Sequence, residues 1–139
     1  MILLDTGPVV ALCDPRDGLN RTALRDLETL RRDPVVLCSP VLTEACFLLG
    51  HAVQRQRLAR VLAEFSVRPY EIDDEARLWL EALAWMQRYR DQDPDLADAY
   101  LAVVSGREHR FRLWTYDREF STIWRRPDGS PIPLAVRRR

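Results

Sequence analysis

The chain has 139 residues, 30% of them charged and 47% apolar, with 5 Gly and 9 Pro. This profile is typical of one folded domain and excludes a collagen-like, low-complexity or repeat protein. The 21 basic residues are balanced by 21 acidic ones, which argues against a general polybasic nucleic-acid binder. All the basic residues are arginine, and a chain without lysine cannot be a P-loop NTPase or a Schiff-base enzyme.

The charge is uneven along the chain. Residues 107–139 carry 9 Arg and 4 acids, while residues 1–106 carry 12 Arg and 17 acids. Any contact with a polyanion is therefore expected in the C-terminal third. We predict a single domain over residues 1–139 whose last part, from about 127, is an irregular basic tail.

The cysteines and histidines indicate neither disulfides nor zinc. Cys13, Cys38 and Cys46 lie in or beside apolar runs and show no C-x-x-C spacing, so we interpret them as reduced core thiols of a cytoplasmic protein. His51 and His109 lack the spacing of zinc ligands. The N-terminus lacks the basic leader of a signal peptide, and no segment approaches the ~18 apolar residues of a membrane span.

Short apolar runs alternate with longer segments of helical periodicity, and we take these elements in chain order. Strands are predicted at residues 1–4, 35–38, 67–72 and 111–116, with a short fifth at 122–124. Helices are predicted at 9–13, 20–30 with Asn20 as cap, 39–49, around 58–65, from 73 to about 89, and from 95 to about 103. This alternation predicts an α/β fold with a mostly parallel sheet of about five strands, covered by helices on both faces.

Two acids directly follow predicted strands. Asp5 ends the first apolar run, and Asp117 ends the fourth. Ligands of open α/β sheets collect beyond the carboxyl ends of the strands, so these residues are candidates for a shared site. The alternative for Asp5 is a simple turn or helix cap.

Two further acids lie on predicted helices. Glu44 lies at the edge of an apolar stripe, between Val41 and Leu48. A carboxylate in that position needs a metal ion or another partner, because a buried unpaired charge is unfavourable. The alternative to a metal site is a salt bridge with an arginine. Asp98 lies in the first turn of a helix that Asp95 can cap, and it joins the site only if that helix begins at the same crevice.

If the four carboxylates converge, they raise one another's pKa values unless a cation neutralises them. Oxygen ligands favour Mg²⁺ or Mn²⁺ over zinc. Such an ion can orient a water, lower the pKa of that water and stabilise an in-line displacement at phosphorus. The residues therefore favour phosphodiester hydrolysis.

Four segments carry a resemblance over essentially the whole chain: MILLDTGPVVAL, PVLTEACFLL, DLADAYLAVV and LWTYDREF. In their order and spacing they resemble the PIN-domain family, particularly the VapC-type toxin ribonucleases of bacterial toxin–antitoxin pairs. The family's four acids fall on Asp5, Glu44, Asp98 and Asp117. Its auxiliary positions fall on Thr6, Asp95 and Thr115.

The resemblance implies a PIN-like three-layer fold and a Mg²⁺-dependent endoribonuclease with those four acids as catalytic residues and metal ligands. It also implies a homodimer, a cognate VapB-like antitoxin, and a heterotetramer or octamer as the assembled complex. We consider Trp79, Trp85, Tyr89 and Tyr100 for the dimer face, with burial in the core as the alternative.

Basic residues near the last strand are the candidates for RNA phosphate contacts. They are Arg107, Arg110, Arg112 and Arg118, with 137–139 extending the path. The alternative for each of these arginines is simple exposure to solvent.

Other functions are considered as well. One is a PIN-like module that binds RNA or an antitoxin without cutting. An aspartate-phosphorylated receiver domain needs a lysine that the chain lacks, and a phosphatase of the haloacid-dehalogenase type needs an aspartate where Gly7 stands.

Overall fold

Four short parallel strands form the centre of the fold. The computed structural model describes residues 1–136, and its sheet consists of β1 (Ile2–Leu4), β2 (Val35–Leu37), β3 (Arg68–Pro69) and β4 (Arg112–Trp114), in the order β3-β2-β1-β4. Ile2 pairs with Val35 on one side and with Arg112 on the other. β1 is thus an inner strand buried along its whole length, which explains why it reads as a continuous apolar run.

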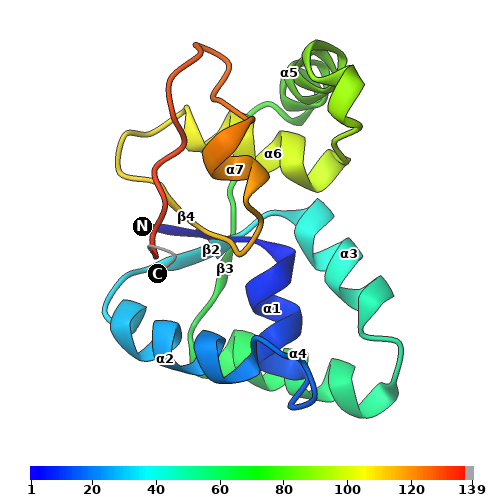
Figure 1. Ribbon diagram of the computed structural model, residues 1–139, viewed down its shortest axis with the longest axis vertical. Helices are drawn as coiled ribbons and strands as arrows, with labels where there is room; N and C mark the ends of the chain where they lie inside the picture. The colour runs from blue at the N-terminus through cyan, green and yellow to red at the C-terminus, as the bar shows by residue number, and fades with distance from the viewer. Residues whose placement is uncertain (137–139) are drawn as a thin grey trace.

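The helices cover both faces of this sheet, as predicted. In Figure 1, α1, α2 and α4 lie on one side of the strands and α5, α6 and α7 on the other, with α3 beside them. Their bounds are α1 Thr6–Cys13, α2 Asn20–Leu30, α3 Ser39–Leu48, α4 Ala52–Glu64, α5 Glu75–Arg88, α6 Leu96–Ser105 and α7 Glu119–Thr122, with a 3-10 turn at Arg90–Gln92. The α/β class and the parallel sheet are confirmed.

The predicted fifth strand at 122–124 is wrong. α7 ends at Thr122, and the Phe120 and Trp124 rings, four residues apart, pack edge to face with centroids separated by 4.8 Å. The edge beside β4 is met instead by the C-terminal segment, where the Leu113 amide donates to the Pro133 carbonyl at 2.8 Å. The segment after residue 127 is therefore not irregular throughout, and residues 137–139 lie outside the described part of the chain.

The structure also decides two local questions about the helices. The buried face of α5 carries Leu78, Ala82 and Trp85, whereas Trp79 and Leu83 are 52% and 56% exposed. Apolar residues lie at helical spacing on both faces of α5. The face that carries the small Ala82 packs against α6. Asn20 is not the cap of α2: Leu19 holds that position, and the Asn20 side-chain amide donates to the Ala11 carbonyl at 2.7 Å.

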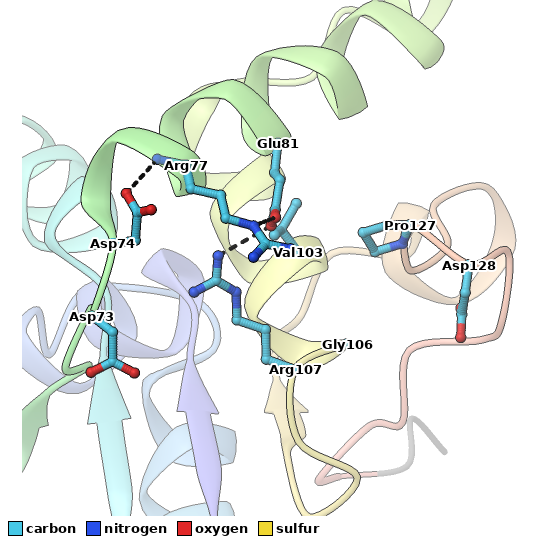
Figure 2. Close-up of a pocket in the computed structure, with 9 residues that line it drawn as sticks. All are labelled: Asp73, Asp74, Arg77, Glu81, Val103, Gly106, Arg107, Pro127 and Asp128. Carbon is cyan, nitrogen blue, oxygen red and sulfur yellow. Dashed lines mark hydrogen bonds and ion pairs between the residues drawn. The ribbon is translucent and has the colours of Figure 1, made fainter.

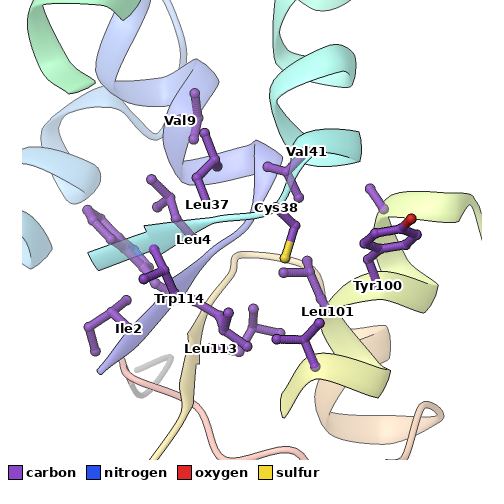
Figure 3. Close-up of a cluster of buried hydrophobic side chains, with 14 of the residues drawn as sticks. Ile2, Leu4, Val9, Leu37, Cys38, Val41, Tyr100, Leu101, Leu113 and Trp114 are labelled. Carbon is purple, nitrogen blue, oxygen red and sulfur yellow. The ribbon is translucent and has the colours of Figure 1, made fainter. Parts of the chain in front are cut away.

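One hydrophobic core joins the layers. Figure 3 shows side chains from β1, β2 and β4 packed against those of α6, with Leu101 and Leu113 fully buried. Trp85 and Tyr100 are each 3% exposed, so these two belong to the core rather than to a dimer face. Cys13 and Cys38 are buried as expected, but Cys46 is exposed.

No helix within residues 1–136 has both the length and the apolar character that crossing a membrane requires.

Candidate active site

Asp5 is a buried carboxylate at the end of β1. Its Oδ1 accepts from the Thr6 amide at 2.7 Å and caps α1, and its Oδ2 accepts from the Thr115 hydroxyl at 2.6 Å. Burial raises the Asp5 pKa to about 6; the Thr115 and Thr6 bonds oppose the rise, and the charges of Glu44 and Asp117 add to it. Asp5 is therefore a helix cap that also lies among other acids.

Glu44 reaches the same place from α3. Its Oε2 accepts from the hydroxyl of Thr6, the residue after Asp5, at 2.6 Å. Burial raises the Glu44 pKa, and the charge of Asp95 raises it further. Among residues 1–136 no arginine forms an ion pair with Glu44. Within that part of the chain, Glu44 therefore does not form the salt bridge that we considered as the alternative.

Asp95 and Asp98 bring the beginning of α6 to the site. The Asp95 carboxylate accepts from the Asp98 amide at 2.8 Å, and the Asp98 carboxylate accepts from the Asp95 amide at 3.0 Å. Burial raises the Asp98 pKa to about 8, and the charges of Asp95 and Asp5 contribute to the rise. Asp95 lines one cavity together with Glu44, so α6 begins beside the site.

Asp117 follows β4 and is exposed. Its amide donates to the Thr115 hydroxyl at 3.0 Å, and its Oδ1 accepts from the Glu119 amide at 2.9 Å. Thr115 thus binds both Asp5 and the turn that carries Asp117, which explains how residues 112 positions apart in the chain come to share one site.

The chemistry of these donors fits a hard divalent cation. Every donor is a carboxylate oxygen, the charges act on one another, and within residues 1–136 no arginine forms an ion pair with Asp5, Glu44 or Asp98. The same part of the chain has no three His, Cys, Asp or Glu side chains already gathered as metal ligands. Carboxylates without a counter-ion repel one another, and a cation bound between them would remove that repulsion.

Three of the four predicted RNA contacts lie elsewhere. Arg112 begins β4, and it pairs with Asp33 at 3.1 Å; Arg110 pairs with Glu108 at 3.3 Å. Both therefore lie toward the edge where the strands begin, opposite the acids. Arg107 lies after the far end of α6.

Arg107 lines a pocket of its own. Figure 2 shows its guanidinium beside Glu81, to which it is bound at 3.1 Å, while Arg77 binds the same carboxylate at 2.8 Å. Of these four predicted arginines, Arg118 alone, which follows Asp117, lies at the acidic edge, the edge of the sheet where Asp5 and Asp117 follow their strands.

Helix α2 is a neighbour of the site that sequence analysis missed. The hydroxyl of Tyr116, which precedes Asp117, donates to the Asp26 carboxylate at 2.8 Å. The indole of Trp114 donates to the same hydroxyl at 3.2 Å. Asp26 reads as an ordinary solvated acid on a helix, and nothing in the sequence distinguishes it.

We predict that Glu44→Gln leaves the metal-free protein at least as stable as the native chain. The substitution removes a negative charge from the acid cluster, while the amide oxygen can still accept from Thr6. Thermal melting in EDTA checks this, with Glu64→Gln, an exposed acid of α4, as control. A melting temperature several degrees lower for Glu44→Gln alone would contradict the idea that repulsion dominates there.

A parallel sheet with helices on both faces and acids at the carboxyl ends of its strands is the arrangement of an α/β protein with a candidate active site at that edge. Among solved structures, the crystal structure of VapC20 from Mycobacterium tuberculosis, described as a toxin that cleaves the sarcin–ricin loop, matches with a TM-score of 0.72 and 25% identity, over 87% of this chain and 93% of that one. The resemblance to PIN-domain VapC toxins is thereby confirmed. No protein-family model matches the sequence, and a comparison with curated proteins finds no match.

Proposed function

We propose that this protein is a metal-dependent endoribonuclease that acts as the toxin of a type II toxin–antitoxin pair. The observation that carries the proposal is the environment of Asp5: it is 7% exposed, and the charges of Glu44, Asp98 and Asp117 act around it without an arginine ion pair to Asp5 within residues 1–136. Burial of an uncompensated carboxylate is costly, and a divalent cation removes that cost.

The proposed ligands are Asp5, Glu44, Asp98 and Asp117. A bound Mg²⁺ or Mn²⁺ supplies positive charge against the phosphodiester and lowers the pKa of a coordinated water. The side chains of Thr115 and Thr6 orient Asp5 and Glu44 through the two 2.6 Å hydrogen bonds, which restricts these carboxylates to few rotamers. Asp95 supports α6 through its cap and presents a further carboxylate.

RNA is the substrate that we propose, because VapC20 is described as a toxin that cleaves the sarcin–ricin loop. From the likeness to a VapC toxin we also propose a cytoplasmic homodimer that binds a VapB-like antitoxin, in a heterotetramer or an octamer. The exposed aromatic Trp79 on α5 remains available for such an interface, at 52% exposure.

We expect the purified protein to cleave RNA with Mg²⁺ and to lose cleavage in EDTA. The test uses a labelled RNA hairpin containing the sarcin–ricin loop and an unrelated hairpin of equal length, each with Mg²⁺, Mn²⁺ or EDTA. Restoration by Mg²⁺ after EDTA treatment supports a metal requirement. Equal cleavage in Mg²⁺ and in EDTA would contradict it and would indicate a contaminating nuclease or a metal-free mechanism.

The second candidate is a PIN-like module that binds RNA or an antitoxin without cutting. It is favoured by one observation, that no metal-binding group is assembled within residues 1–136. Such a module would bind the hairpins with equal affinity in Mg²⁺ and EDTA and leave them intact.

A further inference from the structure

The acidic site has two unlike flanks. On the side of α3 and α6 lies a cavity of about 560 Å³ whose lining includes Glu44, Glu75 and Asp95 together with the apolar Phe47 and Leu96. Phe47 is 85% exposed. Three carboxylates at the border of an apolar groove repel phosphates, so this flank is a poor path for a nucleic-acid backbone.

The opposite flank is formed by α2 and the turn after β4. The Tyr116 hydroxyl binds Asp26 at 2.8 Å and so fastens α2 beside the turn that carries Asp117 and Arg118. Arg25 precedes Asp26 on this helix. Because Tyr116 directly precedes Asp117, this hydrogen bond brings the part of α2 that carries Arg25 close to the acidic edge.

Both arginines of this flank are available to an anion. The five ion pairs within residues 1–136 involve other arginines, and both Arg25 and Arg118 are exposed. The neighbouring Asp26 accepts from Tyr116, and the guanidinium of Arg25 makes a weak 3.4 Å hydrogen bond to the Thr22 hydroxyl. A phosphate can replace that bond with a stronger, charge-assisted one.

We propose that Arg25 and Arg118 bind the RNA phosphates next to the scissile linkage, so that the substrate strand crosses the site on its α2 side. The proposal rests on the proposed ribonuclease function and adds to it which flank holds the backbone. It also replaces the expectation that Arg107, Arg110 and Arg112 do so. The chemistry is that of guanidinium with phosphodiester, which fixes the position of the strand without reading its bases.

The experiment measures RNA binding by fluorescence anisotropy with a labelled single-stranded RNA and Mg²⁺, in the Asp5→Asn background so that the RNA stays intact. Arg25→Gln, Arg118→Gln and the double variant are compared with Arg60→Gln, an exposed arginine of α4 that forms no ion pair within residues 1–136. Salt is varied from about 50 to about 300 mM. We expect each single variant to weaken binding several-fold and to reduce the salt slope by about 0.7, the loss of one phosphate contact to a single strand.

Arg25→Lys tests whether the loss of binding comes from the loss of charge or from a disturbed fold. It retains the positive charge, so it should keep the native salt slope. In the otherwise native protein, Arg25→Gln should raise KM and leave kcat nearly unchanged. Native slopes in Arg25→Gln and Arg118→Gln, or an equal loss in Arg60→Gln, would overturn the proposal. The native protein could fail to cut RNA while the two arginine variants still reduce the salt slope of RNA binding. That result would contradict the proposed ribonuclease function and would support RNA binding on the α2 side of the site.

Discussion

Replacing Asp5 by asparagine is expected to reduce Mg²⁺-dependent RNA cleavage by at least about 100-fold, the usual effect of removing one group that stabilises charge in a transition state. Asp5 is the most buried of the four acids, and both of its oxygens accept hydrogen bonds from the scaffold. Asparagine keeps the size of the side chain and one oxygen acceptor, but it loses the charge that attracts a cation. Single-turnover cleavage of a labelled hairpin measures the effect.

The matched control is Asp73→Asn. Asp73 is an exposed carboxylate that lines the pocket of Figure 2, away from the acidic edge, and its replacement should leave cleavage within about twofold. Thermal melting of both variants verifies that they fold. Cleavage by Asp5→Asn at the native rate, with a native melting curve, would refute the metal-ligand role of Asp5.

The same substitution separates an enzyme from a binding module in cells. A ribonuclease toxin should lose any growth inhibition with Asp5→Asn, because the effect comes from cleavage. A module that acts by holding RNA or an antitoxin should keep its effect, because the surface outside the acid site is unchanged. Expression of both forms without the antitoxin distinguishes these cases.

The acids could be placed from sequence because strand polarity determines their location. Asp5 and Asp117 each follow an apolar run, and in a parallel sheet the carboxyl ends of the strands share one edge. The same rule explains the error in the arginines. Arg110 and Arg112 precede or begin the strand that Asp117 follows, so they lie at the opposite edge of the sheet. The excess of positive charge in the C-terminal third does not show at which edge of the sheet each arginine lies.

Other details depend on packing that periodicity does not encode. Both faces of α5 carry large apolar residues at helical spacing, and the face with Ala82 is buried because a small side chain allows close approach of α6. The contact between Tyr116 and Asp26 joins residues 90 positions apart and leaves no pattern in the sequence. The position of α2 beside the site therefore required the structure.

The metal-free protein is expected to become less stable as pH rises from about 4 to about 8. Burial raises the pKa of Asp5 from 3.8 to about 6 and that of Asp98 to about 8, with neighbouring charges contributing to both shifts. A carboxyl whose pKa is raised by folding binds its proton more tightly in the folded state, so protonation stabilises the fold. That stabilisation is complete below the unfolded pKa and is lost as pH rises through the folded pKa.

For Asp5 alone the shift corresponds to about 3 kcal/mol, or several degrees in melting temperature. Mg²⁺ should reverse the trend, because it binds the ionised carboxylates of the folded chain. Differential scanning calorimetry at pH about 5 and about 8, with and without Mg²⁺ at matched ionic strength, measures both effects. We expect Mg²⁺ to raise the melting temperature strongly at the higher pH and weakly at the lower one, where protons compete for the same oxygens.

A melting temperature that is independent of pH without metal, or an equal Mg²⁺ effect at both pH values, would contradict this account. In Asp5→Asn the metal-free protein should melt higher than the native chain at pH about 8, since one buried charge is gone, and should respond less to Mg²⁺. These two changes together distinguish a metal ligand from a residue that only supports the fold. If Asp5 were only structural, its replacement would lower the melting temperature and leave the response to Mg²⁺ intact.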